Sequence, residues 1–239
     1  MKLLLTVVIT LFCIMSFAQQ KFNTLSAKEK KAGWKLLFDG ATTKGWHSFN
    51  KTNAGSAWKV KGEALYLDTT KKDGWQTADG KDLTSDKAYS NFDLKLEWKI
   101  SRAGNSGIIF FAQEDGKHQN SWETGPEMQI ADNEENEDGH VVKHQAGDLY
   151  ALISCSQKRV KPAGEWNRVE IISQNGRLTL MVNNVKVIST TMWNEGWKKL
   201  IAGSSFKDMP GFGKFHSGKI ALQDHAAEVA FRNIKIKKL

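Results

Sequence analysis

The chain is poor in cysteine and proline. Of its 239 residues, only two are cysteine and three are proline. Cys13 lies in an N-terminal apolar run, so removal of that run would leave Cys155 alone and no internal disulfide could form. Stability must therefore come from a hydrophobic core. Cys155 has no local sequence context that would make it a nucleophile.

The sequence also lacks a second long apolar run. The one present, Leu3–Phe17, follows the basic Lys2 and precedes a small residue, Ala18, as in an export signal. The run is too short and too poorly flanked to be a membrane anchor. We expect residues 1–18 to be a signal peptide and 19–33 a leader, which makes the protein exported, either periplasmic or secreted, with no membrane anchor.

No basic tract with interleaved aromatic residues occurs, although the formal net charge is +8. The lysines are scattered, many of them at outward positions of expected strands. Such spacing is typical of a solvated surface, and an exported protein rarely meets nucleic acid. The sequence therefore argues against a nucleic-acid partner.

What the chain does contain is a strand pattern from Trp34 onward. Residues 92–100 alternate apolar and polar side chains, which predicts a strand with one buried face. Residues 166–173 and 177–183 flank Asn175-Gly176, a strong hairpin signal. No segment longer than about one turn reads as a helix, apart from a short turn near 26–31. These features predict an all-β, antiparallel jelly-roll sandwich forming a single domain over residues 34–239.

The segment Gly125–Asn133 contains the most suggestive polar pair. If residues 127–131 form a strand, Glu127 and Gln129 share one face while Met128 and Ile130 face the core. An acid and an amide in the middle of a sheet are costly unless that face lines a cleft. A structural hydrogen-bonded pair is the other interpretation. Asp132 would join this face only through a bulge.

The C-terminal residues 218–239 predict two half-buried strands around a short turn. Gln223 and His225 are two residues apart and can face the same side of the sheet. Asn105 precedes another buried strand, within a glycine-flanked turn that would let the backbone approach a ligand closely.

Metal binding finds weaker support. The acidic segment 132–139 resembles a calcium loop but fails the EF-hand spacing, so an acidic solvated loop is the better interpretation. His140 and His144 lie four residues apart, yet nothing nearby in the sequence completes a ligand set. No cofactor is therefore predicted, while a divalent metal such as calcium stays an open alternative.

Short motifs spread along the whole chain carry a family resemblance. The sequence resembles the exported jelly-roll domains known as 3-keto-disaccharide hydrolases. The matching segments are 37–40 (LFDG), 45–46 (GW), 105–108 (NSGI), 127–130 (EMQI), 132–133 (DN), 147–150 (GDLY), 164–167 (GEWN), 182–184 (VNN), 218–225 (GKIALQDH) and 231–234 (FRNI).

This resemblance implies a concanavalin-like fold acting on oxidised sugars. A ketone at C3 of a hexose acidifies the C2 proton, and the resulting enolate can expel the substituent on C1. Addition of water then gives net hydrolysis without the carboxylate pair of ordinary glycosidases. The reaction needs a base, an acid and a donor or cation for the enolate oxygen.

We therefore expect the following site. The catalytic candidates are Glu127, His225, His144 and Lys207, and the substrate-binding candidates are Asn105, Gln129, Asp132, Gln223, Arg232 and Trp193. Trp197 and Trp122 are further candidates for exposed rings that stack on sugar, whereas Trp98 and Trp166 are expected in the core.

Two other functions stay open at this point. One is a non-catalytic carbohydrate-binding module, and the other is a conventional glycoside hydrolase using Glu127 and Asp132. In each case the partner is an oligosaccharide or glycoside. Oxidation of the sugar would require a separate enzyme.

Overall fold

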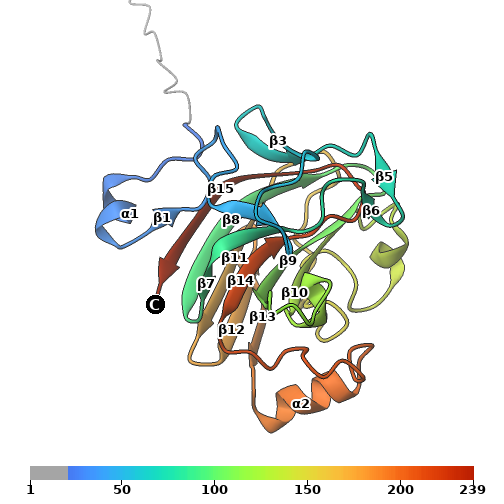
Figure 1. Cartoon of the computed structure of the whole chain (residues 1–239). Helices are drawn as coiled ribbons and strands as arrows, with labels where there is room; N and C mark the ends of the chain where they lie inside the picture. Colours follow the sequence, from blue (N-terminus) through green and yellow to red (C-terminus); the bar gives the residue numbers. More distant parts are fainter. Residues whose placement is uncertain (1–20) are drawn as a thin grey trace, which may run out of the picture.

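Two antiparallel sheets packed face to face form the body of the protein (Figure 1). The computed structural model describes residues 21–239, so the predicted signal peptide at 1–18 lies outside the described residues. The expected all-β, antiparallel jelly-roll sandwich is confirmed.

The larger sheet has eight strands in the order β13-β12-β11-β8-β15-β4-β3, with β1 paired to β15. Its strands are β1 (Lys35–Leu36), β3 (Trp58–Lys61), β4 (Ala64–Leu67), β8 (Phe92–Ile100), β11 (Asn167–Gln174), β12 (Arg177–Val182), β13 (Val185–Thr191) and β15 (Val229–Lys238).

The smaller sheet has five strands in the order β10-β9-β14-β7-β2. They are β2 (Trp46–Ser48), β7 (Leu83–Tyr89), β9 (Asn105–Ala112), β10 (Glu127–Ala131) and β14 (Gly218–Leu222). A separate hairpin of β5 (Lys72–Asp73) and β6 (Gln76–Thr77) stands beside it. The two C-terminal strands, β14 and β15, belong to different sheets, so the turn between them crosses from one layer to the other.

The core lies between the sheets and follows the alternation of the sequence. Phe92, Leu94, Leu96, Trp98 and Ile100 of β8 are at most 2% exposed. Side chains from the inner face of the smaller sheet meet them, because successive residues of a strand point to opposite sides. The outer face of the smaller sheet is left free to carry polar groups.

Helices are few, but one of them, α2 (Glu195–Ala202), is longer than the single turn expected from the sequence. The short turn is α1 (Ala27–Lys31), capped by Ser26 in a capping box with Glu29. The eight-residue α2 was not predicted from the sequence. Its N-cap Asn194 accepts from the backbone N–H of Trp197 at 2.8 Å. Two 3₁₀ turns, η1 (Ser121–Glu123) and η2 (Glu137–His140), lie in the long loops.

Two tryptophans differ from expectation. Trp197 was expected to be exposed, but it is 2% exposed and donates its ring N–H to the carbonyl of Gly213 at 2.8 Å. Trp166 was expected in the core but is only half-buried, with its ring under the guanidinium of Arg232 at 3.9 Å. Amphipathic packing of one helix face explains the first case, and cation–π stacking on a sheet surface explains the second.

Candidate active site

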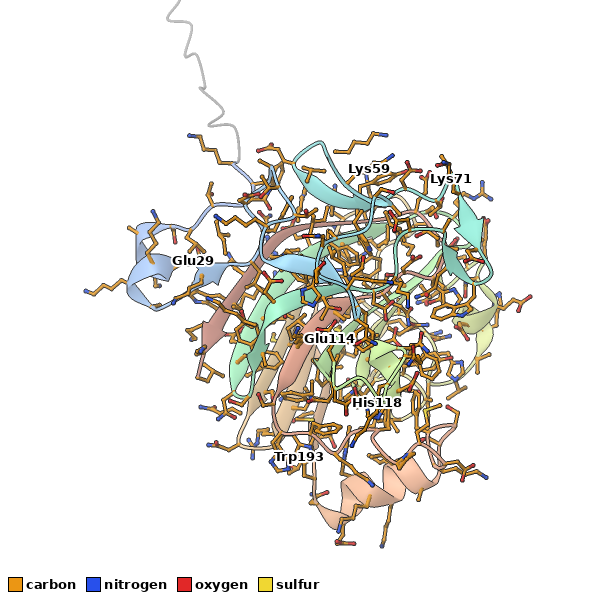
Figure 2. The ribbon with its side chains drawn as sticks, viewed as in Figure 1. Glu29, Lys59, Lys71, Glu114, His118 and Trp193 are labelled. Atoms are coloured by element: carbon orange, nitrogen blue, oxygen red, sulfur yellow. The ribbon has the colours of Figure 1, made fainter. Side chains whose placement is uncertain are left out.

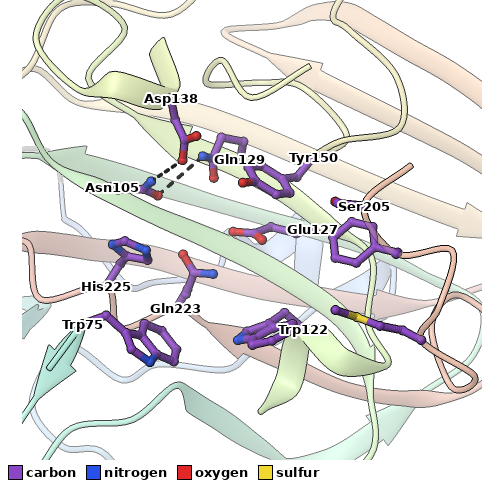
Figure 3. Close-up of a pocket in the computed structure, with 12 residues that line it drawn as sticks. Trp75, Asn105, Trp122, Glu127, Gln129, Asp138, Tyr150, Ser205, Gln223 and His225 are labelled. Atoms are coloured by element: carbon purple, nitrogen blue, oxygen red, sulfur yellow. Dashed lines mark hydrogen bonds between the residues drawn. The ribbon is translucent and has the colours of Figure 1, made fainter. Parts of the chain in front are cut away.

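A pocket of about 310 Å³ opens on the outer face of the smaller sheet, at the β10 edge (Figure 3). Its floor is polar and its walls are largely aromatic. The lining residues are Trp75, Asn105, Trp122, Glu127, Gln129, Asp138, Tyr150, Ser205, Phe206, Met209, Gln223 and His225.

Strands β9 and β10 supply most of the floor. Glu127 and Gln129 alternate with the buried Met128 and Ile130, as the sequence predicts. Gln129 pairs with Gly107 across the two strands. The amide of Gln129 also approaches the side-chain oxygen of Asn105 at 3.5 Å, so these side chains gather on one face (Figure 3).

Glu127 is a buried acid on the floor of the pocket, and its pKa is shifted. Its side chain is almost fully buried, and this burial raises its pKa well above the ordinary value. The negative charges of Asp82 and Asp138 raise the pKa further. Burial and the neighbouring negative charges both favour the protonated form of Glu127, which can donate a proton or a hydrogen bond.

The end of β14 brings in two more residues. The backbone N–H of Gln223 donates to the carbonyl of Gly107 at 2.9 Å, which places Gln223 beside Glu127 on the floor. His225 is exposed on the rim, where its ring lies 5.6 Å from that of Trp75. Trp75 belongs to the tip of the β5–β6 hairpin and is 43% exposed.

Asp224, between these two residues, points away from the pocket. Its carboxylate accepts from the hydroxyl of Thr77 at 2.6 Å and thereby ties the β5–β6 hairpin to the end of β14. Its backbone N–H donates to the buried carboxylate of Asp82 at 3.0 Å. Burial raises the pKa of Asp82 to about 6. The two buried acids fix the backbone that presents Gln223 and His225.

The loop at 132–147 is not simply a solvated acidic segment, because it sends Asp138 into the pocket. One carboxylate oxygen of Asp138 accepts from Asn105 at 2.7 Å, and the other lies 2.9 Å from Nδ1 of His144. The His144 ring packs against that of Tyr150, with the ring centroids 4.3 Å apart and the planes tilted by 31°. His144 thus supports Asp138 and Tyr150 from behind and does not itself line the pocket.

Tyr150 reaches the pocket because residues 147–150 pair with the outer edge of β10. The N–H of Tyr150 donates to the carbonyl of Glu127 at 3.0 Å, and that of Gly147 to the carbonyl of Gln129 at 2.9 Å. Burial raises the pKa of Tyr150 to about 12, so its hydroxyl stays protonated.

Besides His144, four more residues expected at the site lie outside the pocket. Asp132 is turned toward the backbone N–H of Ala103, at 2.8 Å, where it closes a loop. Arg232 lies on the larger sheet in an ion pair with Glu97 at 2.8 Å. Lys207 and Trp193 line a neighbouring groove. None of the four lines the pocket that holds Glu127.

Asp138, Tyr150 and Trp75 line the pocket but were not predicted from the sequence. Tyr150 belongs to the family motif at 147–150, and Asp138 belongs to the acidic segment at 132–139. Trp75 carried a usable signal, since it is an aromatic residue at the tip of a polar hairpin. Across residues 21–239, no group of three or more histidine, cysteine or acidic side chains is arranged to hold a metal.

The floor has an unusual property: three of its oxygens lack a partner. Within the described part of the chain, Oε1 of Glu127, of Gln129 and of Gln223 are buried without a hydrogen bond. Buried polar atoms are normally satisfied, so three together indicate a ligand rich in hydrogen-bonding groups. Tryptophan walls around such a floor suit the apolar face of a sugar.

Comparisons with known proteins agree with this geometry. A family model described as 3-keto-alpha-glucoside-1,2-lyase-like domain matches residues 33–237. A 3-keto-disaccharide hydrolase from Bacteroides thetaiotaomicron is 32% identical over 245 residues, covering 94% of this chain and 84% of the relative.

The chain is also similar to solved structures that are described as candidate glycosyl hydrolases. A crystal structure from Parabacteroides distasonis, described as a candidate glycosyl hydrolase, has a TM-score of 0.82 at 33% identity and covers 92% of this chain and 100% of that one. Another structure from that organism, with the same description, has a TM-score of 0.61 at 23% identity, over 87% and 84% of the two chains, and supports the fold alone.

Fold, site and relatives together define a jelly-roll, carbohydrate-active enzyme of the glycoside hydrolase type. The chain belongs to the family of 3-keto-alpha-glucoside-1,2-lyase-like domains. Among residues 21–239 no helix is long and apolar enough to cross a membrane.

Proposed function

We propose that this enzyme cleaves 3-keto glycosides by removing the C2 proton and eliminating the C1 substituent, followed by addition of water. The observation that carries the proposal is the buried Glu127, whose pKa is raised by burial, set among the unpartnered oxygens of Gln129 and Gln223. Such a floor combines a proton donor with groups that bind hydroxyls. The family and the curated relative suggest the keto sugar as the substrate class.

In the first half of the reaction, His225, which lies on the rim of the pocket, takes the proton from C2. The electrons move to the C3 carbonyl, and the amide N–H groups of Gln129 and Gln223 stabilise the enolate oxygen. The C1–O bond then breaks as Glu127 donates its proton to the leaving oxygen. The product is a 2-hydroxy-3-keto glycal.

In the second half, the roles reverse. The Glu127 carboxylate takes a proton from water, whose oxygen adds to C1, and the protonated His225 returns a proton to C2. Substrate and water are thereby converted to the 3-keto sugar and the free alcohol. Both side chains end in their starting protonation states.

A conventional two-carboxylate hydrolysis is the second candidate function, and the position of Asp138 supports it. Asp138 lines the same pocket as Glu127 and replaces Asp132, which the sequence had suggested as the second carboxylate. Asp138 would act as the second carboxyl group beside Glu127. A binding module without catalysis would use the same floor and the same tryptophan walls.

Turnover separates these three functions. Purified protein is incubated with a 3-keto glucoside and with its unoxidised parent, each with and without a chelator. Release of the alcohol from the keto sugar alone supports our proposal, and release from the parent supports the two-carboxylate reaction. Sugar binding with no release from either leaves the binding module. The chelator arm tests for a divalent metal such as calcium.

We further propose that the enzyme is exported and acts in the periplasm or outside the cell. The support is the apolar N-terminal segment at 2–18, which ends in a small residue. Its 3-keto substrate must come from a separate enzyme that oxidises the C3 hydroxyl. Expression of the full chain in a bacterial host, followed by fractionation and mass measurement, tests export: an uncleaved, cytoplasmic protein would contradict it.

A further inference from the structure

A second concavity, which we call the aromatic groove, lies between α2 and the segment that follows it. It has a volume of about 570 Å³, and its lining includes Trp193, Trp197, Lys198, Lys207, Lys214 and His216. Trp193 lies next to α2 (Figure 2) and stacks on His216, with ring centroids 3.8 Å apart and planes at 10°. The groove therefore offers a flat aromatic wall.

The aromatic groove shares a wall with the active-site pocket. Met209 lines both cavities. Phe206 lines the pocket and Phe212 lines the groove, and their rings stack at 3.8 Å with planes at 8°. A turn joins them, with the N–H of Met209 donating to the carbonyl of Phe206 at 3.0 Å. A ligand leaving the pocket across Met209 would enter the groove directly.

The charge of the groove has a single sign. Three lysines and one histidine line it, and no acidic residue does. Lys198 is paired with Glu195 at 2.7 Å, but Lys207 and Lys214 form no ion pair within residues 21–239. Both are exposed at the rim. Aromatic walls under unpaired ammonium groups are complementary to a flat ring that carries an anionic substituent.

From this geometry we propose that the aromatic groove is the subsite for the leaving group, and that it selects glycosides whose alcohol is an arene bearing a carboxylate or similar anion. The inference rests on the proposed cleavage of 3-keto glycosides, because that reaction defines which end of the substrate leaves. It also gives Lys207 a role in selectivity and not in catalysis.

The test compares two substrates of matched shape, the 4-carboxyphenyl and the 4-carbamoylphenyl 3-keto glucosides. In the variant Lys207→Glu/Lys214→Glu, the ratio of kcat/KM for the charged substrate to that for the neutral one should fall about tenfold. The control variant Lys186→Glu/Lys199→Glu changes the net charge equally at exposed positions outside the groove, and its ratio should stay within twofold. An unchanged ratio in the groove variant, or an equal fall in both, would overturn the inference.

A binding measurement separates failure of the groove from failure of the proposed reaction. Unoxidised 4-carboxyphenyl glucoside is titrated into each protein and followed by tryptophan fluorescence. Binding by the native protein that weakens in the groove variant supports the subsite, even if no keto glucoside is cleaved. Cleavage of methyl 3-keto glucoside without any such binding would remove the subsite and leave the reaction standing.

Discussion

The carboxyl group of Glu127 lies directly over the α-carbon of Gly107 on the neighbouring strand. A β-carbon added at position 107 would lie 1.6 Å from Oε1 of Glu127 and 2.5 Å from its carboxyl carbon. Only glycine at 107 therefore leaves room for the acid. The floor of the pocket is shaped by a missing side chain as much as by the polar ones.

Gly107→Ala should consequently lower turnover by about a hundredfold or more, because Glu127 must leave its position. We expect the free energy of unfolding to fall as well, by about 1–3 kcal/mol, as in other overpacked sites. Steady-state kinetics and urea unfolding measure the two effects.

Gly196→Ala is the matched control for this change. Gly196 lies in α2, and an added β-carbon would meet only Oδ1 of Asn194, at 3.3 Å. The activity of the Gly196→Ala variant should stay at the native level. Full activity of Gly107→Ala would show that the position of Glu127 over Gly107 is not needed for catalysis.

Removing either proposed proton-transfer group should lower turnover strongly. Glu127→Gln keeps the shape but loses the acid, and His225→Ala loses the base, so kcat should fall about a hundredfold or more in each. His140→Ala, an exposed histidine outside the pocket, should leave kcat unchanged. Near-native rates in both pocket variants would remove these residues from the mechanism.

The charge of Asp82 should set the alkaline limit of activity. Because Glu127 acts in its protonated form, kcat should fall as pH rises through its raised pKa. Ionised Asp82 contributes to that raised value, so Asp82→Asn should lower the pKa of Glu127 and move the alkaline limb of the kcat profile to lower pH. A limb that stays in place would show that it reports another group.

The pH dependence of protein stability provides an independent measure of the raised pKa of Asp82. The pKa of Asp82 is raised from 3.8 to about 6, so the stability that its protonated form contributes is present below pH 3.8 and lost as pH rises to about 6. Native protein should lose about 2 kcal/mol relative to Asp82→Asn between pH 4 and pH 6. Parallel stability curves from urea unfolding at pH 4, 5 and 6 would contradict the shift.

The exposed ring of Trp75 should contribute to binding more than to catalysis. Trp75→Ala should raise KM about tenfold, because sugar stacking is lost, with kcat changed less than threefold. Trp75→Phe keeps an aromatic face and should lie near the native value. An unchanged KM for the alanine variant would mean that the sugar does not reach the hairpin.

The fold could be predicted largely from local pattern. The alternation of β8 and the Asn175-Gly176 hairpin gave correct strands, because side-chain period and turn chemistry are local properties. The assignment of β14 and β15 to different sheets was not predictable in this way. It depends on which strands pair across long sequence distances.

In the candidate site, too, the residues on strands could be predicted and those on loops could not. The outward positions of Glu127 and Gln129 followed from strand alternation. Asp138 and Tyr150 reach the pocket through loops, whose path is set by the pairing of residues 147–150 with the edge of β10. Lys207 was expected at the chemistry, but the turn after α2 directs it into the aromatic groove.

The most direct test of the central claim is NMR of the reaction in deuterated water with a 3-keto glucoside. Deprotonation at C2 predicts deuterium at C2 of the released 3-keto sugar, or a 2-hydroxy-3-keto glycal at early times. Free 3-keto glucose incubated without protein for the same period corrects for spontaneous exchange. Release of the alcohol with hydrogen retained at C2 and no glycal would contradict elimination.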